Sequence, residues 1–145
     1  MFALAVWLIL LFVFTCTEST KELYYNHSVG FQWESSPVLA DMLENSLQAE
    51  PFFIMQKVGH VSMFVVLFLL LHSTFRSRSA AFWLSLLCAG GSEVLQLYFG
   101  RDGRIHDIFI DSIGIGIGWL LVKWRASRRK KTGRTKRKHR VPAGS

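Results

Sequence analysis

The sequence predicts an all-α integral membrane bundle: four transmembrane helices, an amphipathic helix in an extracytoplasmic loop, and a disordered basic C-terminal tail. Half of the 145 residues are hydrophobic, and they gather into separate runs near the length of about 20 residues that a bilayer-spanning helix needs. Charge is segregated as well. All 10 acidic residues precede Lys123, whereas 11 of the 17 Lys and Arg residues lie from Lys123 onward. This length suits a single domain.

Residues 1–17 are predicted to form the first transmembrane helix. The run MFALAVWLILLFVFTC is almost wholly apolar. It lacks the basic start and the A-x-A cleavage site of a secretory signal peptide, which favours a retained anchor. Cleavage of residues 1–16 remains the alternative. Two isolated cysteines, Cys16 and Cys88, indicate neither a disulfide framework nor a metal site.

Residues 18–56 are predicted to form an extracytoplasmic loop, because they hold six acidic residues against Lys21 alone. Ser36 and Pro37 suit the N-cap and first position of a short helix. Apolar residues then recur with helical period. They are Val38, Leu39, Met42, Leu43 and Leu47. An ordinary loop with one helical turn is the alternative.

Residues 57–124 are predicted to form a three-helix core, with helices at about 58–75, 80–99 and 105–124. The basic residues 125–145 follow as a tail with little apolar content, which predicts disorder. Lys and Arg favour the cytoplasmic side. Because Arg76, Arg78 and the tail fall on one side of a four-helix arrangement, we expect a multi-pass cell-membrane protein with both termini cytoplasmic. Beside a membrane helix, the tail indicates anionic lipid as a partner, and we expect no nucleic-acid partner.

Polar residues from separate stretches are predicted to converge at the outer face. Ionisable groups at membrane depth cost about 2.5–3.5 kcal/mol each on insertion scales, so they usually have a partner or a purpose. Glu93 and Gln96 share one helical face, as do Asp107 and Asp111 with the small residues Gly114 and Gly118, which permit close helix packing. The candidate ligand-binding residues are Lys57, His60, Glu93, Gln96, Arg101, Arg104, Asp107 and Asp111.

Three interpretations of these residues remain open. Lys57, Arg101 and Arg104 could hold a lipid phosphate. Glu93, His60 and Asp107 are the candidate acid–base groups if the protein is an enzyme. The whole set could instead only lock the helices together. Because His60, His106, Glu93 and Asp107 lack the tight spacing of a metal motif, the sequence predicts no metal and no cofactor.

Three motifs resemble the VanZ-like family of small bacterial membrane proteins. They are K57-V-G-H60-x-x-x-F64, E93-V-L-Q96 and R101-x5-D107-x3-D111-x2-G114. The resemblance covers roughly residues 50–122. Asp111 departs from it, since the family usually has Asn at this position.

The resemblance implies a multi-helix membrane protein of the bacterial cell envelope. The family's namesake is associated with resistance to teicoplanin, a lipoglycopeptide that targets lipid-linked cell-wall precursor. We therefore expect a protein that engages a phospholipid or such a precursor at the outer leaflet. The alternative is a membrane-embedded enzyme that modifies an envelope lipid or glycan. The sequence favours binding over catalysis, and it decides neither the ligand nor the oligomeric state.

Overall fold

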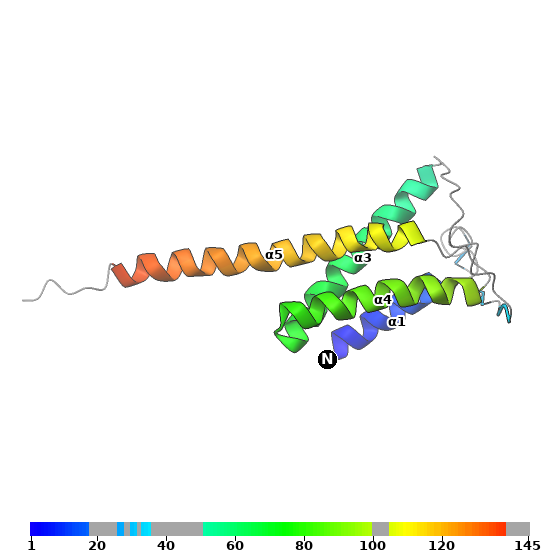
Figure 1. Ribbon diagram of the computed structural model, residues 1–145, viewed down its shortest axis with the longest axis horizontal. Helices are drawn as coiled ribbons and strands as arrows, with labels where there is room; N and C mark the ends of the chain where they lie inside the picture. Colours follow the sequence, from blue (N-terminus) through cyan, green and yellow to red (C-terminus); the bar gives the residue numbers. More distant parts are fainter. Residues whose placement is uncertain (18–25, 28–29, 32, 36–50, 100–104, 139–145) are drawn as a thin grey trace, which may run out of the picture.

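The computed structural model describes residues 1–17, 26–27, 30–31, 33–35, 51–99 and 105–138 (Figure 1). In these ranges the chain forms four α-helices and no strand: α1 (Phe2–Cys16), α3 (Pro51–Phe75), α4 (Arg78–Tyr98) and α5 (Ile105–Lys138). Three segments are long and apolar enough to cross a bilayer: Ile54–Phe75, Arg78–Tyr98 and Ile105–Arg129. The all-helical membrane architecture is as predicted. α1 has only 15 residues, so a fourth crossing stays a prediction.

α3 begins earlier than predicted, at Pro51 and not at residue 58. Proline suits the first helical turn, because its fixed φ is already helical and its missing N–H would have no intrahelical partner there. Lys57 is consequently a residue of the helix and does not stand at its entrance. α4 is capped by Ser77, whose side chain accepts a hydrogen bond of 3.3 Å from the backbone N–H of Ala80.

The prediction of a disordered tail from residue 125 is wrong for residues 125–138, which continue α5 as helix. Lys and Arg are good helix formers, and positive charge in the last turns complements the helix dipole. A 34-residue helix is about 51 Å long, whereas the hydrocarbon core is only about 30 Å thick. The basic part of α5 must therefore project from the bilayer, as its extension beyond the other helices indicates (Figure 1).

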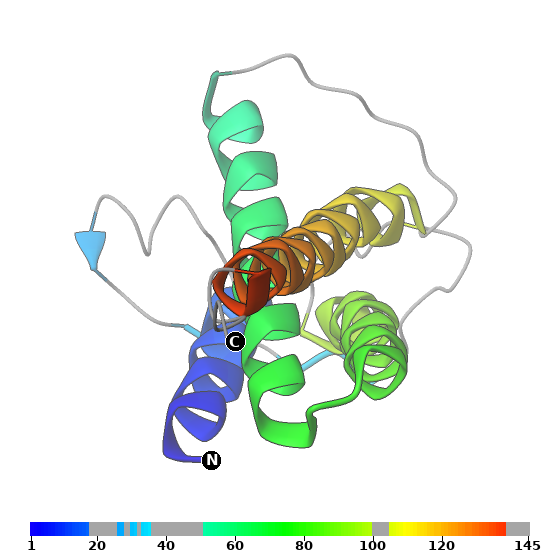
Figure 2. The same ribbon diagram turned by 90° about the vertical axis from the view of Figure 1, so that its left-hand side faces the viewer.

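α3 lies at the centre of the bundle and packs against α1, α4 and α5. Its side chains Phe64, Leu67 and Phe68 are completely or almost completely buried. Figure 2 shows α3 crossing α5 steeply, with α4 beside them. α1 is joined to α3 by the indole of Trp7, which donates a hydrogen bond of 3.2 Å to the carbonyl of Met63.

α5 approaches α3 closely at two glycines. A Cβ at Gly114 would overlap the backbone carbonyl of Val61 and lie 3.2 Å from Cβ of Phe64. At Gly118 it would lie 2.9 Å from the ring of Phe68. Residues four apart share a helical face. The same close face of α5 therefore carries Asp107 and Asp111 toward α3.

The predicted loop helix at residues 36–50 lies outside the described residues. The described part of the loop contacts the ends of α1 and α4. The backbone N–H of Glu34 donates to the carbonyl of Tyr98 at 2.8 Å, and the Trp33 ring stacks on the Tyr98 ring at 5.4 Å. Phe31 contacts the rings of Phe12 and Phe99. This end of the bundle thus has an aromatic rim.

Candidate functional site

A set of polar side chains lies inside the bundle where α3, α4 and α5 meet. We call it the polar cluster. It consists of Lys57, His60, Glu93, Gln96, Asp107 and Asp111. Glu93 and Asp111 are fully buried, and Gln96 and Asp107 are only 3% and 6% exposed.

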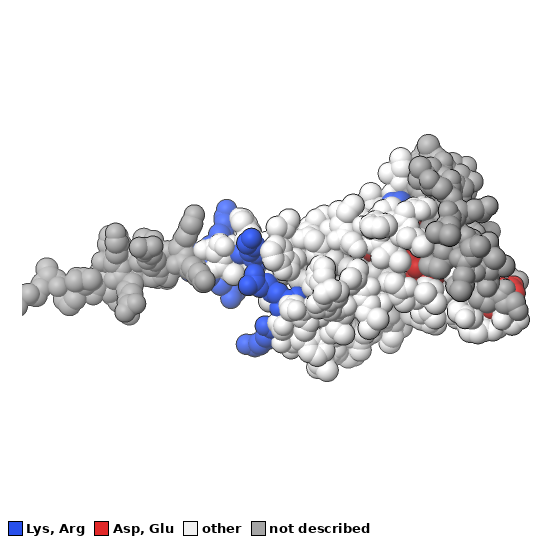
Figure 3. Space-filling view, in the orientation of Figure 1, with Lys and Arg blue, Asp and Glu red and all other residues white. Residues whose placement is uncertain are grey.

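The two ends of the bundle differ in charge. In the face shown in Figure 3, acidic side chains gather at one end, where a small basic patch is also visible, and most Lys and Arg side chains gather at the other. The basic end carries exposed Arg76 and Arg78 and the exposed start of the projecting part of α5. The N-terminus lies toward the basic end as well (Figures 1 and 2). The polar cluster belongs to the opposite, acidic end.

Lys57 on α3 forms an ion pair with Asp107 on α5. Their side chains are 14% and 8% exposed, so water only weakly screens the attraction between the two charges. Each charge is therefore stabilised mainly by the other. Among the described residues, the partner of Asp107 is Lys57, since α3 packs directly on the face of α5 that carries Asp107.

His60 and Asp111 form a second pair between α3 and α5. The Nδ1 atom of His60 lies 3.2 Å from Oδ1 of Asp111. The other carboxylate oxygen of Asp111, Oδ2, is buried and has no hydrogen-bond partner within the described ranges. A buried acceptor without a partner costs about 1–3 kcal/mol, so the position of Asp111 calls for an explanation.

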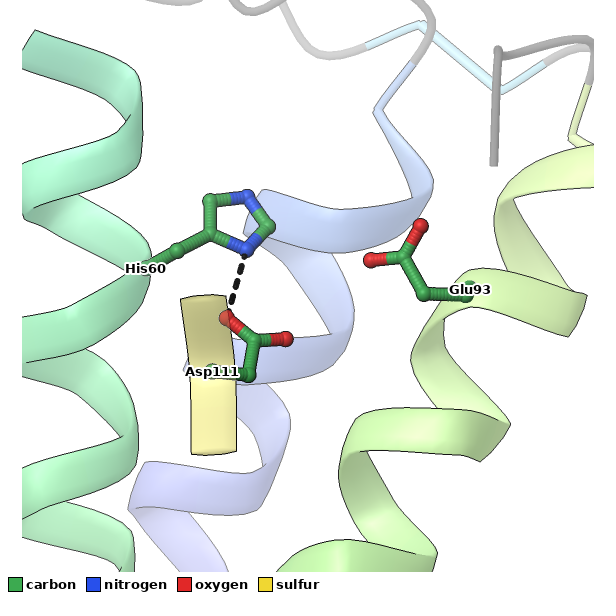
Figure 4. A group of neighbouring side chains, drawn as sticks. All are labelled: His60, Glu93 and Asp111. Carbon is green, nitrogen blue, oxygen red and sulfur yellow. Dashed lines mark hydrogen bonds and ion pairs between the residues drawn. The ribbon is translucent and has the colours of Figure 1, made fainter. Parts of the chain in front are cut away.

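Glu93 faces this pair from α4. Figure 4 shows His60 and Glu93 pointing toward each other from opposite helices, with Asp111 between them and its second oxygen on the Glu93 side. One ligand atom from each of these residues lies within 4.8 Å of the others. An imidazole and two carboxylates could coordinate a metal ion, or they could exchange protons with a bound substrate.

The structure brings five of the eight predicted ligand-binding residues together: Lys57, His60, Glu93, Asp107 and Asp111. Gln96 is buried one turn from Glu93 on the same face of α4. The other two, Arg101 and Arg104, lie in the connection between α4 and α5, outside the described residues. The sequence interpretation missed the aromatic rim around Trp33, Tyr98 and Phe99. The available signal was their position next to helix ends, since aromatic residues favour the membrane–water boundary.

Comparison with known proteins identifies the family. The VanZ/LLP1 family matches residues 1–126. The chain belongs to the VanZ/LLP1 family. A membrane protein of Bacillus subtilis, YwnJ, described as uncharacterized, is 37% identical over 117 residues, covering 79% of this chain and 83% of the relative. No solved structure matches the chain.

The VanZ/LLP1 match includes α1 and every residue of the polar cluster. It ends within the projecting part of α5, so residues 127–138 of that helix lie beyond it. The VanZ/LLP1 assignment and the apolar helices establish a membrane protein. The polar cluster is the part of this VanZ/LLP1 protein that bears on what it binds or transforms.

Proposed function

We propose that this VanZ/LLP1 protein engages the headgroup of an outer-leaflet lipid, either a phospholipid or a lipid-linked cell-wall precursor. The observation that carries the proposal is the convergence of α3, α4 and α5 on one polar cluster at the acidic end of the bundle. Six polar side chains there come from three helices, and four of them are almost fully buried. Burying ionisable groups in a membrane protein is costly, which favours a ligand-related role.

The proposal assigns the acidic end to the outer face. Exposed Arg76, Arg78, Lys123 and Arg125 lie at the other end, and Lys and Arg favour the cytoplasm. Both termini are then cytoplasmic, provided that α1 also crosses the membrane. The aromatic rim of Trp33, Tyr98 and Phe99 would lie at the outer boundary, where aromatic rings are favoured.

Cationic side chains supply the contact with a phosphate in this proposal. Arg101 and Arg104 belong to the short sequence that connects α4 to α5, and guanidinium groups match phosphate geometry. Lys57 is already paired with Asp107, so it would have to share its charge with the ligand. Glu93, Gln96 and Asp107 orient the cations.

The proposal includes a link to lipoglycopeptide resistance, because such drugs bind the lipid-linked precursor at the outer leaflet. The test is teicoplanin susceptibility of a sensitive Gram-positive host that expresses the wild type or Glu93→Gln, with the membrane level of each protein quantified. We expect the wild type to raise the inhibitory concentration and the variant, at equal abundance, to raise it less. Equal resistance from both proteins would argue against a working cluster. Unchanged susceptibility with good expression would overturn the resistance link.

A second candidate function is an enzyme that modifies an envelope lipid or glycan. The His60–Asp111 pair favours it, because a carboxylate that orients an imidazole is a common feature of general-base catalysis. Glu93, which faces the pair, would be the second acid–base group. Mass spectrometry of membrane lipids from cells with and without the protein tests this function. A product that accumulates with the wild type and is absent with His60→Gln supports it, and identical lipid profiles contradict it.

A further inference from the structure

We propose that His60, Glu93 and Asp111 form a binding site for a divalent transition-metal ion, of the Zn²⁺ or Mn²⁺ class. The three ligand atoms lie within 4.8 Å of one another. They come from three different helices, so no short sequence motif predicts the site. This inference is independent of the lipid proposal, because it concerns what the buried cluster holds with or without a lipid.

The geometry is close to that of a coordinated ion. Bonds of about 2.0–2.1 Å in a tetrahedral site place neighbouring ligand atoms roughly 3.3 Å apart. His60 Nδ1 and Asp111 Oδ1 are already 3.2 Å apart. The widest separation, at most 4.8 Å, has to shrink by about 1.5 Å to reach this spacing.

A second observation points to a ligand at this position. Asp111 has 0% exposure, and its Oδ2 atom has no hydrogen-bond partner in the described part of the chain. Figure 4 shows that this oxygen faces the space between His60 and Glu93. A cation in that space would satisfy the buried acceptor of Asp111.

The donor set selects the class of ion. Imidazole suits Zn²⁺ and other transition metals, whereas Mg²⁺ and Ca²⁺ prefer sites made of oxygen atoms alone. One nitrogen and two carboxylate groups leave coordination positions for water or for a substrate oxygen, as in open metal sites. The neighbouring Lys57–Asp107 pair lies one turn away on both α3 and α5, and it is not part of the ligand set.

The test is a metal titration of the full chain, purified in detergent through a tag without histidines and stripped with a chelator. Zn²⁺ is measured by competition with a chromogenic chelator, and Mn²⁺ by electron paramagnetic resonance. We expect one ion per chain for the wild type. Because a metal site depends strongly on each ligand, we expect His60→Gln, Glu93→Gln and Asp111→Asn each to weaken binding at least about ten-fold.

Two control variants remove an imidazole or a carboxylate at positions outside the proposed metal site. His72→Gln changes another histidine of α3, and Glu34→Gln changes an exposed carboxylate. Both should bind the metal as the wild type does. Loss of binding in the controls, or full binding in the three ligand variants, would overturn the proposal.

The wild type alone gives an additional readout if a ligand variant fails to fold. Bound Co²⁺ absorbs visible light more strongly in a four- or five-coordinate protein site than in water. We expect such a spectrum, reversed by one equivalent of Zn²⁺. A spectrum equal to that of aqueous Co²⁺, or binding well below one ion per chain, would overturn the metal site.

Discussion

At the scale of single residues, charged side chains inside the helical bundle are stabilised by specific partner side chains. Lys57 and Asp107 are both largely shielded from water, so the loss of either partner leaves a charge in surroundings of low dielectric constant. Removing one member of a buried ion pair can cost about 3–5 kcal/mol, whereas removing both costs much less. The partly exposed Lys57 side chain places this pair toward the lower end of that range.

We therefore predict strong coupling between Lys57 and Asp107. Lys57→Met and Asp107→Asn should each lower the thermal unfolding temperature in detergent, and the double variant should lose less than the sum of the two. The coupling free energy should be about 3 kcal/mol, the upper end of the range for side chains in direct contact. Additive losses in this double-mutant cycle would contradict the pairing.

The face on which each polar residue lies could be predicted from helical spacing, but its partner could not. Glu93 and Gln96 were expected on one face and Asp107 and Asp111 on another, and the structure has them so. The pairing of Asp107 with Lys57, and of Asp111 with His60, depends on how α3 crosses α5. That register is decided by packing at Gly114 and Gly118, and spacing within one helix carries no information about it.

At the scale of helices, the approach of α5 to α3 positions the polar cluster. The contact lacks room for a side chain at Gly114, where a Cβ would overlap the carbonyl of Val61. Gly116, on another face of α5, has nothing within 4 Å of the corresponding position. The two glycines are therefore a matched pair, since the same substitution meets backbone in one case and open space in the other.

We predict that Gly114→Ala destabilises the protein by about 1–3 kcal/mol, as overpacking does in a tight contact. Gly116→Ala should be neutral or stabilising by about 0.5–1 kcal/mol, because alanine is the better helix former. Unfolding by sodium dodecyl sulfate, followed by circular dichroism, measures both. Equal effects of the two substitutions would show that α5 does not approach α3 in this way.

The N-cap of α4 gives a second prediction at this scale. Ser77 accepts the backbone N–H of Ala80, and only Arg76 and Ser77 separate α3 from α4. Ser77→Ala should cost about 0.5–2 kcal/mol, the usual loss for a helix N-cap. Ser79→Ala, in the first turn of α4, serves as the control and should cost little. A loss no larger for Ser77→Ala than for the control, in the same unfolding experiment, would contradict the capping role.

Helix boundaries show where sequence reasoning lost accuracy. The predicted start of α3 at residue 58 followed the apolar run, whereas Pro51 starts the helix before hydrophobicity becomes continuous. The basic segment was expected to be disordered because it has little apolar content. Residues 125–138 nevertheless remain helical, since their intrinsic helix propensity extends a helix that is already nucleated in the apolar segment.

At the scale of the whole molecule, charge polarity predicts the orientation in the membrane. After replacement of Cys16 and Cys88 by serine, single cysteines at Glu34 and at Ser127 should differ in their reaction with a membrane-impermeant maleimide. We expect intact cells to be labelled at position 34 and protected at position 127, which reacts only after lysis. The reverse pattern would invert the proposed topology and place the polar cluster at the cytoplasmic face.

A lipid-binding measurement shows directly whether the acidic end of the bundle holds an anionic lipid headgroup. The protein would be placed in zwitterionic nanodiscs with a trace of polyprenyl pyrophosphate lipid, and bound lipid would be counted by native mass spectrometry. The variants are Arg101→Gln, in the sequence between α4 and α5, and Arg125→Gln, which removes the same charge at the basic end. We expect the wild type and Arg125→Gln to retain the lipid and Arg101→Gln to lose it. Equal retention by both variants, or equal loss from both, would contradict the proposal.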